Sequence, residues 1–75
     1  MNEFATNYNR TICSKIDMEE AMLRNLKDEL VRFSQNTHTD FTDYDKNSIE
    51  YSIKKTDEAI DCLHQSFLNL KRLLG

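Results

Sequence analysis

Residues 49–74 read IEYSIKKTDEAIDCLHQSFLNLKRLL, and this stretch decides the fold. Apolar side chains recur along it in alternating steps of four and three residues, with Thr56 as the one polar member. That spacing puts a continuous stripe on one side of an α-helix and is typical of coiled-coil packing. The members of the stripe are Ile49, Ile53, Thr56, Ile60, Leu63, Phe67, Leu70 and Leu74.

Signals for both ends of this helix flank the stripe. Thr42 followed by Asp45 resembles a capping box, in which each side chain bonds the backbone N–H of the other residue. Lys71 and Arg72 carry positive charge, which suits the C-terminal end of a helix. The sequence therefore predicts a helix over about 42–73.

The same spacing recurs upstream and predicts a first helix over about 8–35, with residues 1–7 frayed. Its stripe contains one polar member, Glu19. Packing the two stripes together predicts a hairpin core made of Ile12, Ile16, Leu23, Leu26, Leu30, Phe33, Ile49, Ile53, Ile60, Leu63, Phe67 and Leu70.

Between the stripes lies SQNTHTDF, residues 34–41, whose polar residues favour turns over helix interiors. We expect a turn over 36–41, with Asn36 in the left-handed conformation that often ends a helix. Helices joined by so short a connection fold back antiparallel. The predicted fold class is all-α: residues 1–75 form a single antiparallel two-helix hairpin with coiled-coil-like packing.

The two polar stripe members, Glu19 and Thr56, are expected at about the same height along the hairpin. A matched polar layer can fix the register of two helices at some cost in stability. The alternative is that they are two unrelated, exposed polar residues, and the sequence leaves both interpretations open.

The bulk composition indicates a chain that cannot bury much by itself. A domain of 75 residues buries only about 60% of the surface that its unfolded form exposes. Its 39% hydrophobic and 31% charged residues are a lean mixture for a self-sufficient core, and the lack of proline favours long helices. Folds of this size usually need a disulfide, a metal or a partner.

Apolar and small residues also lie on flanks beyond the two stripes. A two-helix hairpin hides one stripe from each helix, so these flanks would stay exposed, and exposed apolar patches usually mark interaction sites. Methionine suits a surface that adapts to a partner. The alternative is that the helices rotate and splay to cover part of the flank. We expect partner binding or self-association through Met18, Met22, Ala59, Cys62, Ser66 and Leu73.

The residues with chemical potential do not form a recognisable site. Cys62 and His64 are two positions apart and so lie on opposite sides of a helix, whereas zinc ligands on one helix need a spacing of three or four. Cys13 and Cys62 would lie at similar heights; a disulfide is conceivable, but two reduced packing residues are favoured in the cytosol. His38 is expected to be solvated in the turn.

No glycine-rich phosphate loop or nucleophile elbow is present, so we expect no enzyme, with no catalytic, cofactor or metal site. The net charge of −3 and a longest basic run of Lys54-Lys55 rank nucleic-acid binding low. The start MNEFATNYNR does not look like a signal peptide, and no stretch is apolar enough to span a membrane. We expect a cytoplasmic protein.

Two segments carry a family resemblance that covers roughly residues 18–71. LKDEL at 26–30 precedes the polar turn, and SIKKTDEAIDCLHQSFLNLK at 52–71 contains an Ala-Ile pair ahead of an apolar residue and a histidine. In these features the chain resembles the small helical-hairpin co-chaperones of bacterial type III secretion needle subunits. It differs from them in a longer N-terminal extension and a turn without glycine.

The resemblance implies a role in bacterial virulence through protein–protein interaction. Such a co-chaperone binds a larger chaperone built of tetratricopeptide-like repeats, and together they keep a needle subunit soluble and monomeric before export. No contact residue is carried over from the family. The alternative function is a structural or regulatory hairpin that self-associates into a dimeric four-helix bundle.

Overall fold

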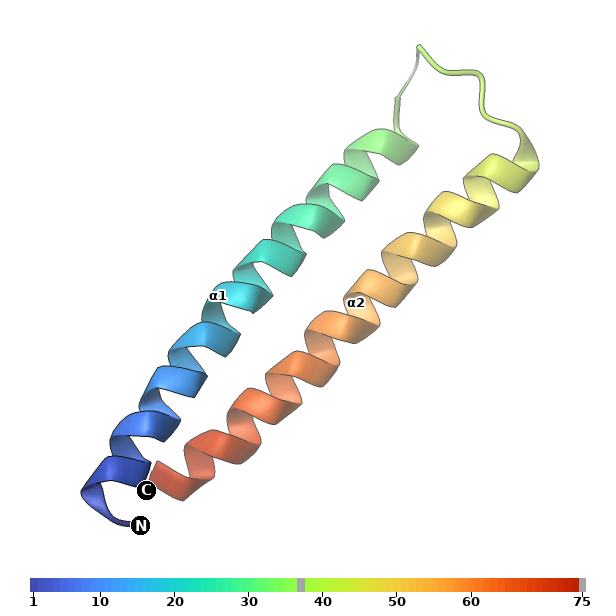
Figure 1. Cartoon of the computed structure of the whole chain (residues 1–75). Helices are drawn as coiled ribbons and strands as arrows, with labels where there is room; N and C mark the ends of the chain where they lie inside the picture. The colour runs from blue at the N-terminus through green and yellow to red at the C-terminus, as the bar shows by residue number, and fades with distance from the viewer. Residues whose placement is uncertain (37, 75) are drawn as a thin grey trace.

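In the computed structural model two long helices lie side by side and antiparallel, joined at one end, with both chain ends together at the other (Figure 1). The structure describes residues 1–36 and 38–74, and the side chain of Leu74 lies outside that description. The elements are α1 (Glu3–Ser34), α2 (Asp43–Lys71) and the short 3-10 helix η1 (Arg72–Leu74). The predicted all-α hairpin is confirmed.

Helix α1 begins at Glu3 and not near residue 8, so the expectation of a frayed N-terminal segment is wrong. Asn2 caps the helix: its Oδ1 accepts a hydrogen bond of 2.8 Å from the backbone N–H of Ala5. Asparagine is among the best N-cap residues because it satisfies a first-turn N–H that has no partner within the helix. The cap lets the helix extend almost to the start of the chain.

The end of α1 also differs from the expectation. None of the described residues has a positive φ, so Asn36 is not left-handed; Gln35 follows the helix at φ −96° and ψ 6°. The backbone N–H groups of Gln35 and Asn36 donate to the carbonyls of Arg32 and Phe33, both at 3.2 Å. A tightened last turn of this kind satisfies the terminal carbonyls without a left-handed residue.

The start of α2 matches the prediction. Thr42 Oγ1 accepts from the backbone N–H of Asp45 at 3.1 Å, and Asp45 Oδ2 accepts from the N–H of Thr42 at 3.0 Å. This confirms the capping box. Just before it, Phe41 packs edge-on against Phe33 of α1 with ring centroids 5.3 Å apart, which holds the end of the connection against the first helix.

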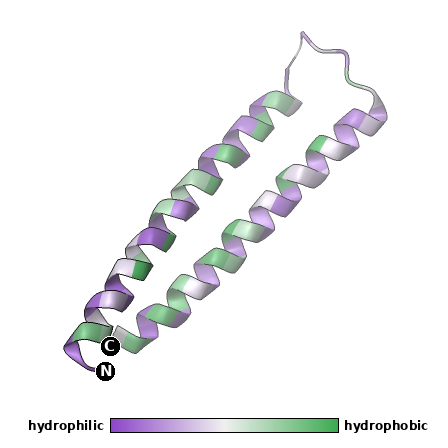
Figure 2. Cartoon of the chain, viewed as in Figure 1, coloured by the Kyte–Doolittle hydropathy of each residue, from purple (hydrophilic) through white to green (hydrophobic). Residues whose placement is uncertain are grey.

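The stripe predicted for α2 faces α1. Ile49 and Ile60 are buried, and Ile53, Thr56, Leu63, Phe67 and Leu70 are half-buried. The side of α1 that faces α2 has the same spacing but differs from the predicted stripe. We call it the inner row of α1, and its members are Asn9, Cys13, Ile16, Glu20, Leu23, Lys27 and Leu30, all buried or half-buried. Hydrophobic and hydrophilic bands accordingly alternate along both helices (Figure 2).

The rotation of α1 overturns part of the predicted core. Ile12, Ile16, Leu23 and Leu30 are half-buried, but Leu26 and Phe33 are 45% and 49% exposed, so placing these two in the core is wrong. Glu19 is exposed as well, which rules out the matched polar layer with Thr56.

The physical reason is that three polar groups of the inner row have partners across the hairpin. Asn9 Nδ2 donates to the carbonyl of Leu70 at 3.0 Å, Glu20 Oε1 lies 3.1 Å from His64 Nδ1, and Lys27 Nζ lies 2.8 Å from Asp57 Oδ1. Each buried or half-buried polar group is therefore satisfied, which removes the penalty for facing inward.

The isolated hairpin is far from compact. Its radius of gyration is 17.3 Å, whereas a compact chain of this length has about 11 Å. Its accessible surface is 5,981 Å², against about 4,800 Å² for a compact monomer of this mass. None of the side chains that the structure describes is completely removed from solvent. Two helices alone therefore leave about 1,200 Å² more surface exposed than a compact domain of this mass.

Candidate protein-binding face

A second row on α1 repeats the heptad-like spacing but faces away from α2. It contains six large hydrophobic side chains, each exposed, from 45% for Leu26 to 77% for Phe4. We call it the outer row of α1, and its members are Phe4, Tyr8, Thr11, Lys15, Met18, Met22, Leu26, Glu29 and Phe33. This row carries more large hydrophobic residues than the inner row does.

Helix α2 and η1 carry a corresponding outer row whose middle consists of short side chains. Tyrosines occupy its start, and Ala59, Cys62 and Ser66 occupy its centre. All of its members are exposed. We call it the outer row of α2, and its members are Tyr44, Ser48, Tyr51, Lys55, Ala59, Cys62, Ser66, Asn69 and Leu73.

The two outer rows lie on the same face of the hairpin. At the loop end one open hollow is lined by Phe33 from α1 and by Tyr44 and Ser48 from α2. Since residues of one row share one side of their helix, the remainder of each row lies on this same face. We call the two rows together the apolar face.

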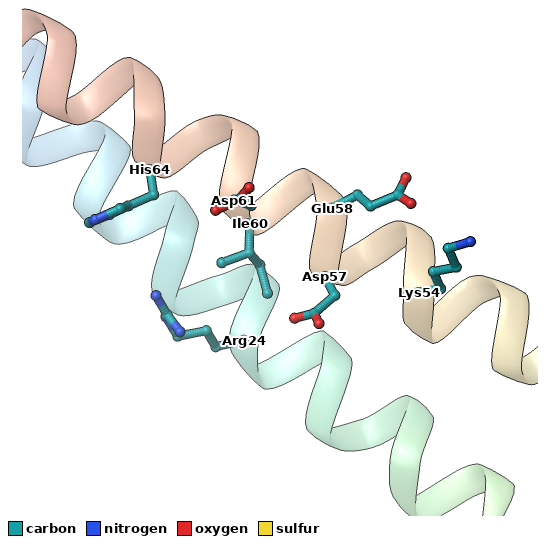
Figure 3. A pocket seen from close by; sticks show the side chains of 7 residues that line it. All are labelled: Arg24, Lys54, Asp57, Glu58, Ile60, Asp61 and His64. Atoms are coloured by element: carbon teal, nitrogen blue, oxygen red, sulfur yellow. The ribbon is translucent and has the colours of Figure 1, made fainter.

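The opposite face is charged. An open groove there is lined by Arg24 of α1 and by residues of α2 (Figure 3). Ile60, Asp57 and His64 point from α2 towards α1, whereas Lys54 and Glu58 point away. Acidic and basic groups are mixed along it, as in the ion pair of Lys27 with Asp57. The lining residues of this charged groove are Arg24, Lys54, Asp57, Glu58, Ile60, Asp61 and His64.

A buried carboxylate ties the two helices together beside this groove. The side chain of Glu20 is 8% exposed; its Oε1 lies 3.1 Å from His64 Nδ1 and its Oε2 lies 3.5 Å from Arg24. The His64 ring also stacks on Phe67, with centroids 6.1 Å apart. His64 therefore faces α1 beside the charged groove, on the side of α2 opposite to Cys62. The arrangement is structural, since it fixes the height of α1 against α2.

All six residues predicted to bind a partner are exposed and share the apolar face. Met18 and Met22 belong to the outer row of α1, and Ala59, Cys62, Ser66 and Leu73 belong to the outer row of α2. Their role in binding stays a prediction. Sequence reasoning missed Tyr8, Leu26 and Phe33 as members of this face. The spacing of Tyr8 from Phe4, and of Leu26 from Met22, was the available signal.

The cysteines are free thiols in different environments. Cys13 is buried between the helices, with Sγ 3.5 Å from Asn9 Oδ1, whereas Cys62 is exposed on the apolar face. The two thiols are not paired, and His38 is exposed in the connection. Within residues 1–36 and 38–74 no three potential ligand side chains gather where they could hold a metal ion. Neither long helix in this described part has an apolar stretch able to cross a membrane.

No protein-family model, curated protein or solved structure matches this chain.

Proposed function

We propose that this chain is a protein-binding co-chaperone of a bacterial type III secretion system. In this proposal its apolar face binds a larger chaperone built of tetratricopeptide-like repeats. Together the two proteins keep a needle subunit soluble and monomeric in the cytoplasm before export. The resemblance in residues 26–30 and 52–71 supports this function at the level of the family.

The observation that carries the proposal is the apolar face itself. Two rows of exposed side chains on one face suit the apolar stripe of a partner helix, a common mode of helix recognition. Met18 and Met22 are flexible and polarizable, so they can fit an irregular partner surface. In a protein built of helical repeats, each repeat buries its apolar side against the next one. A repeat at the end of the array has no such neighbour and therefore presents an apolar stripe.

The surface that the hairpin leaves exposed is adequate for a stable complex. The hairpin exposes about 1,200 Å² more than a compact monomer of its mass, and a specific interface takes about 800 Å² from each partner. Covering the outer rows would bring the chain close to the burial of an ordinary domain. Partner binding would thereby stabilise the hairpin as well as the partner.

The test is co-expression of the chain with a tetratricopeptide-like chaperone and a needle subunit. We expect a soluble ternary complex on size-exclusion chromatography, and its loss with Ala59→Arg, which puts a charge into the centre of the apolar face. The matched control is Ala21→Arg, because Ala21 is exposed in the row of Asp17, Arg24 and Asp28 beside the charged groove.

Elution of the chain apart from both proteins would overturn the proposal. The alternative function, a structural or regulatory hairpin that acts only as its own dimer, uses the same face. The two functions predict different results when the helical chaperone is added in excess. The dimer would persist under the alternative function, whereas the chaperone would displace it under the proposed function.

A further inference from the structure

We infer that, in the absence of another protein, the apolar face closes on a second copy of this chain, with α1 of each copy lying on α2 of the other. The inference goes beyond the proposed function and does not depend on which partner the chain serves. It assigns one occupant to the face and one arrangement to the resulting four-helix bundle.

A single hairpin leaves enough surface exposed for a stable dimer. Each hairpin shows about 1,200 Å² more than a compact monomer because it is elongated, and a dimer that removed this excess from both copies would bury about 2,400 Å². That total lies in the range of stable homodimer interfaces and above the size of transient ones. A second hairpin brings a face of the same length, so the whole of both outer rows is covered at once.

The two halves of the apolar face differ in the size of their side chains. The middle of the outer row of α1 consists of large residues, Met18, Met22 and Leu26, whereas the middle of the outer row of α2 consists of Ala59, Cys62 and Ser66. Large side chains of one helix pack best into the spaces left by small ones on its neighbour. When α1 lies on α2 of the second copy, the large side chains of α1 pack against the short side chains of that α2. The two-fold symmetry makes this contact twice in the dimer.

The large residues of α1 and the short residues of α2 lie at matching heights. The contacts of Glu20 with His64 and of Asn9 with the Leu70 carbonyl give the register of the hairpin, since each puts its two residues at about one height. Because the helices are antiparallel, a step of two along α1 matches a step of two back along α2. Met22 therefore lies at about the height of Ala59 and Cys62, and Met18 lies at about the height of Cys62 and Ser66.

A two-fold axis along the length of the hairpin keeps these heights. It brings the large residue of one copy opposite the small residue of the other, and each α1 runs antiparallel to the α2 that it contacts. Up-and-down bundles of four helices pack in this way, with neighbouring helices nearly antiparallel.

Charge and aromatic residues support the same arrangement nearer the loop. Lys27 contacts Asp57, so Glu29, two residues further along α1, is at about the height of Lys55, two residues back along α2. In the dimer Glu29 of one copy would therefore lie close to Lys55 of the other copy. Lys55 already contacts Glu58 of its own helix at 3.1 Å, so the new pair would share the ammonium group. Further on, Phe33 is close in height to Tyr51.

The other face-to-face arrangement would put α1 on α1 and α2 on α2. Methionines and leucines would then meet one another along one half of the interface, while the short side chains would face one another across the other half. The first contact holds the hairpins apart and the second leaves empty space, which costs packing energy. We therefore assign the arrangement with α1 on α2.

Sedimentation equilibrium of the purified chain tests the dimer. We expect a dimer at tens of micromolar that dissociates on dilution, and a monomer for Ala59→Arg at the same concentration. Ala21→Arg, the same change beside the charged groove, should leave the dimer intact, and circular dichroism should show helical content for all three proteins. A monomeric wild-type chain at about 100 μM, or equal effects of the two arginines, would overturn the inference.

Disulfide trapping tests the arrangement. We would oxidise a mixture of wild-type chain and a Met22→Cys, Cys62→Ser double variant, and expect a covalent heterodimer that links position 22 to Cys62 of the wild-type copy. Ser14→Cys in place of Met22→Cys is the control, because Ser14 is exposed in the row of Arg10 and Asp17 and should not be trapped. Equal trapping of both positions, or trapping only of wild-type with itself through Cys62, would contradict α1 on α2.

A charge swap adds an independent readout. Glu29→Lys should weaken the dimer about tenfold, because each of the two symmetric pairs then becomes repulsive. Adding Lys55→Glu to the same chain should restore it. Failure of the rescue would contradict the arrangement.

The proposed function and this inference fail separately. A chain that is monomeric yet binds the tetratricopeptide-like chaperone through Ala59 loses the dimer and keeps the function. A chain that dimerises as described and ignores both candidate partners keeps the dimer and loses the function.

Discussion

The inner and outer rows of α1 have the same spacing but differ in the side chains that they carry. The inner row, which faces α2, includes Asn9, Glu20 and Lys27, and each of these has a polar partner on the other helix. The outer row, which faces water in the single hairpin, carries Phe4, Met22 and other large hydrophobic residues. In most soluble proteins the hydrophobic row would face the neighbouring helix and the polar row would face water.

The difference supports the proposal that the hairpin is a part of a larger assembly. Polar contacts inside it set the height of one helix against the other, and specific pairs do this better than interchangeable apolar contacts. The hydrophobic residues that would add stability are placed on the apolar face, where only another protein can cover them. Register is thus set within the chain, and in the proposed assembly burial would be completed between chains.

The largest effect on the hairpin itself should come from the α2 side of the inner interface. We expect Ile60→Ala to lower the free energy of unfolding by about 3 kcal/mol, because it empties one of the few buried apolar positions. Leu26→Ala, in the outer row, should cost under about 1 kcal/mol in the monomeric state. Urea unfolding at a concentration where both variants are monomeric compares them; a larger loss for Leu26→Ala would reverse the assignment of the two rows.

The next effect concerns the apolar face. We expect Ser66→Arg to weaken self-association or partner binding by at least about 100-fold, since a charge would be buried without a partner in the centre of an interface. Ser14→Arg, on the other side of α1, should change the affinity less than about threefold. Equilibrium sedimentation or calorimetric titration measures both. Similar affinities for the two variants would mean that the outer rows are not the interface.

A smaller effect should distinguish two adjacent glutamates. We expect Glu20→Ala to destabilise the hairpin by about 1–2 kcal/mol, because it leaves His64 and Arg24 without their shared carboxylate. The half-exposed state of His64 keeps this below the cost of breaking a fully buried pair. Glu19→Ala should stay within about 0.5 kcal/mol, since Glu19 is exposed. Equal losses in thermal or urea unfolding would contradict the rotated inner row.

The smallest effect should be at the start of α2. Thr42→Ala removes the acceptor for the Asp45 N–H and should cost about 1 kcal/mol. Thr39→Ala, in the same connection but outside the cap, should be nearly neutral. The amide of Asp45 should also exchange faster with deuterated solvent in the first variant, and unchanged exchange there would argue against the cap.

Sequence periodicity was sufficient to predict the fold and the inner stripe of α2. The large apolar residues of α2, such as Ile49 and Ile60, form one continuous stripe, so the side that faces α1 was unambiguous. Periodicity was insufficient for α1, where two rows compete. Counting apolar residues favours the row with Leu26 and Phe33, and the outcome depends on whether Glu20 and Lys27 find partners across the hairpin. That information lies in the pairing of two distant segments and not in either helix alone.

The candidate face was predicted in part for the same reason. Met18, Met22, Ala59, Cys62, Ser66 and Leu73 followed from the flanks, but the rotation of α1 adds Leu26 and Phe33 to their side. The N-terminal turn was missed because Asn2 acts as a cap, and this extends the face to Phe4 and Tyr8.

The most direct test that the apolar face is a binding surface uses the two native cysteines. Cys62 lies exposed in the middle of the face and Cys13 is buried between the helices, so one reports on the face and the other on the hairpin. The rate of maleimide alkylation would be followed by mass spectrometry on the dilute chain, on the concentrated chain and with the helical chaperone added. We predict rapid modification of Cys62 in the dilute chain, at least about tenfold slowing when the face is covered, and slow modification of Cys13 throughout. Equally fast alkylation of Cys62 under all three conditions would contradict the account.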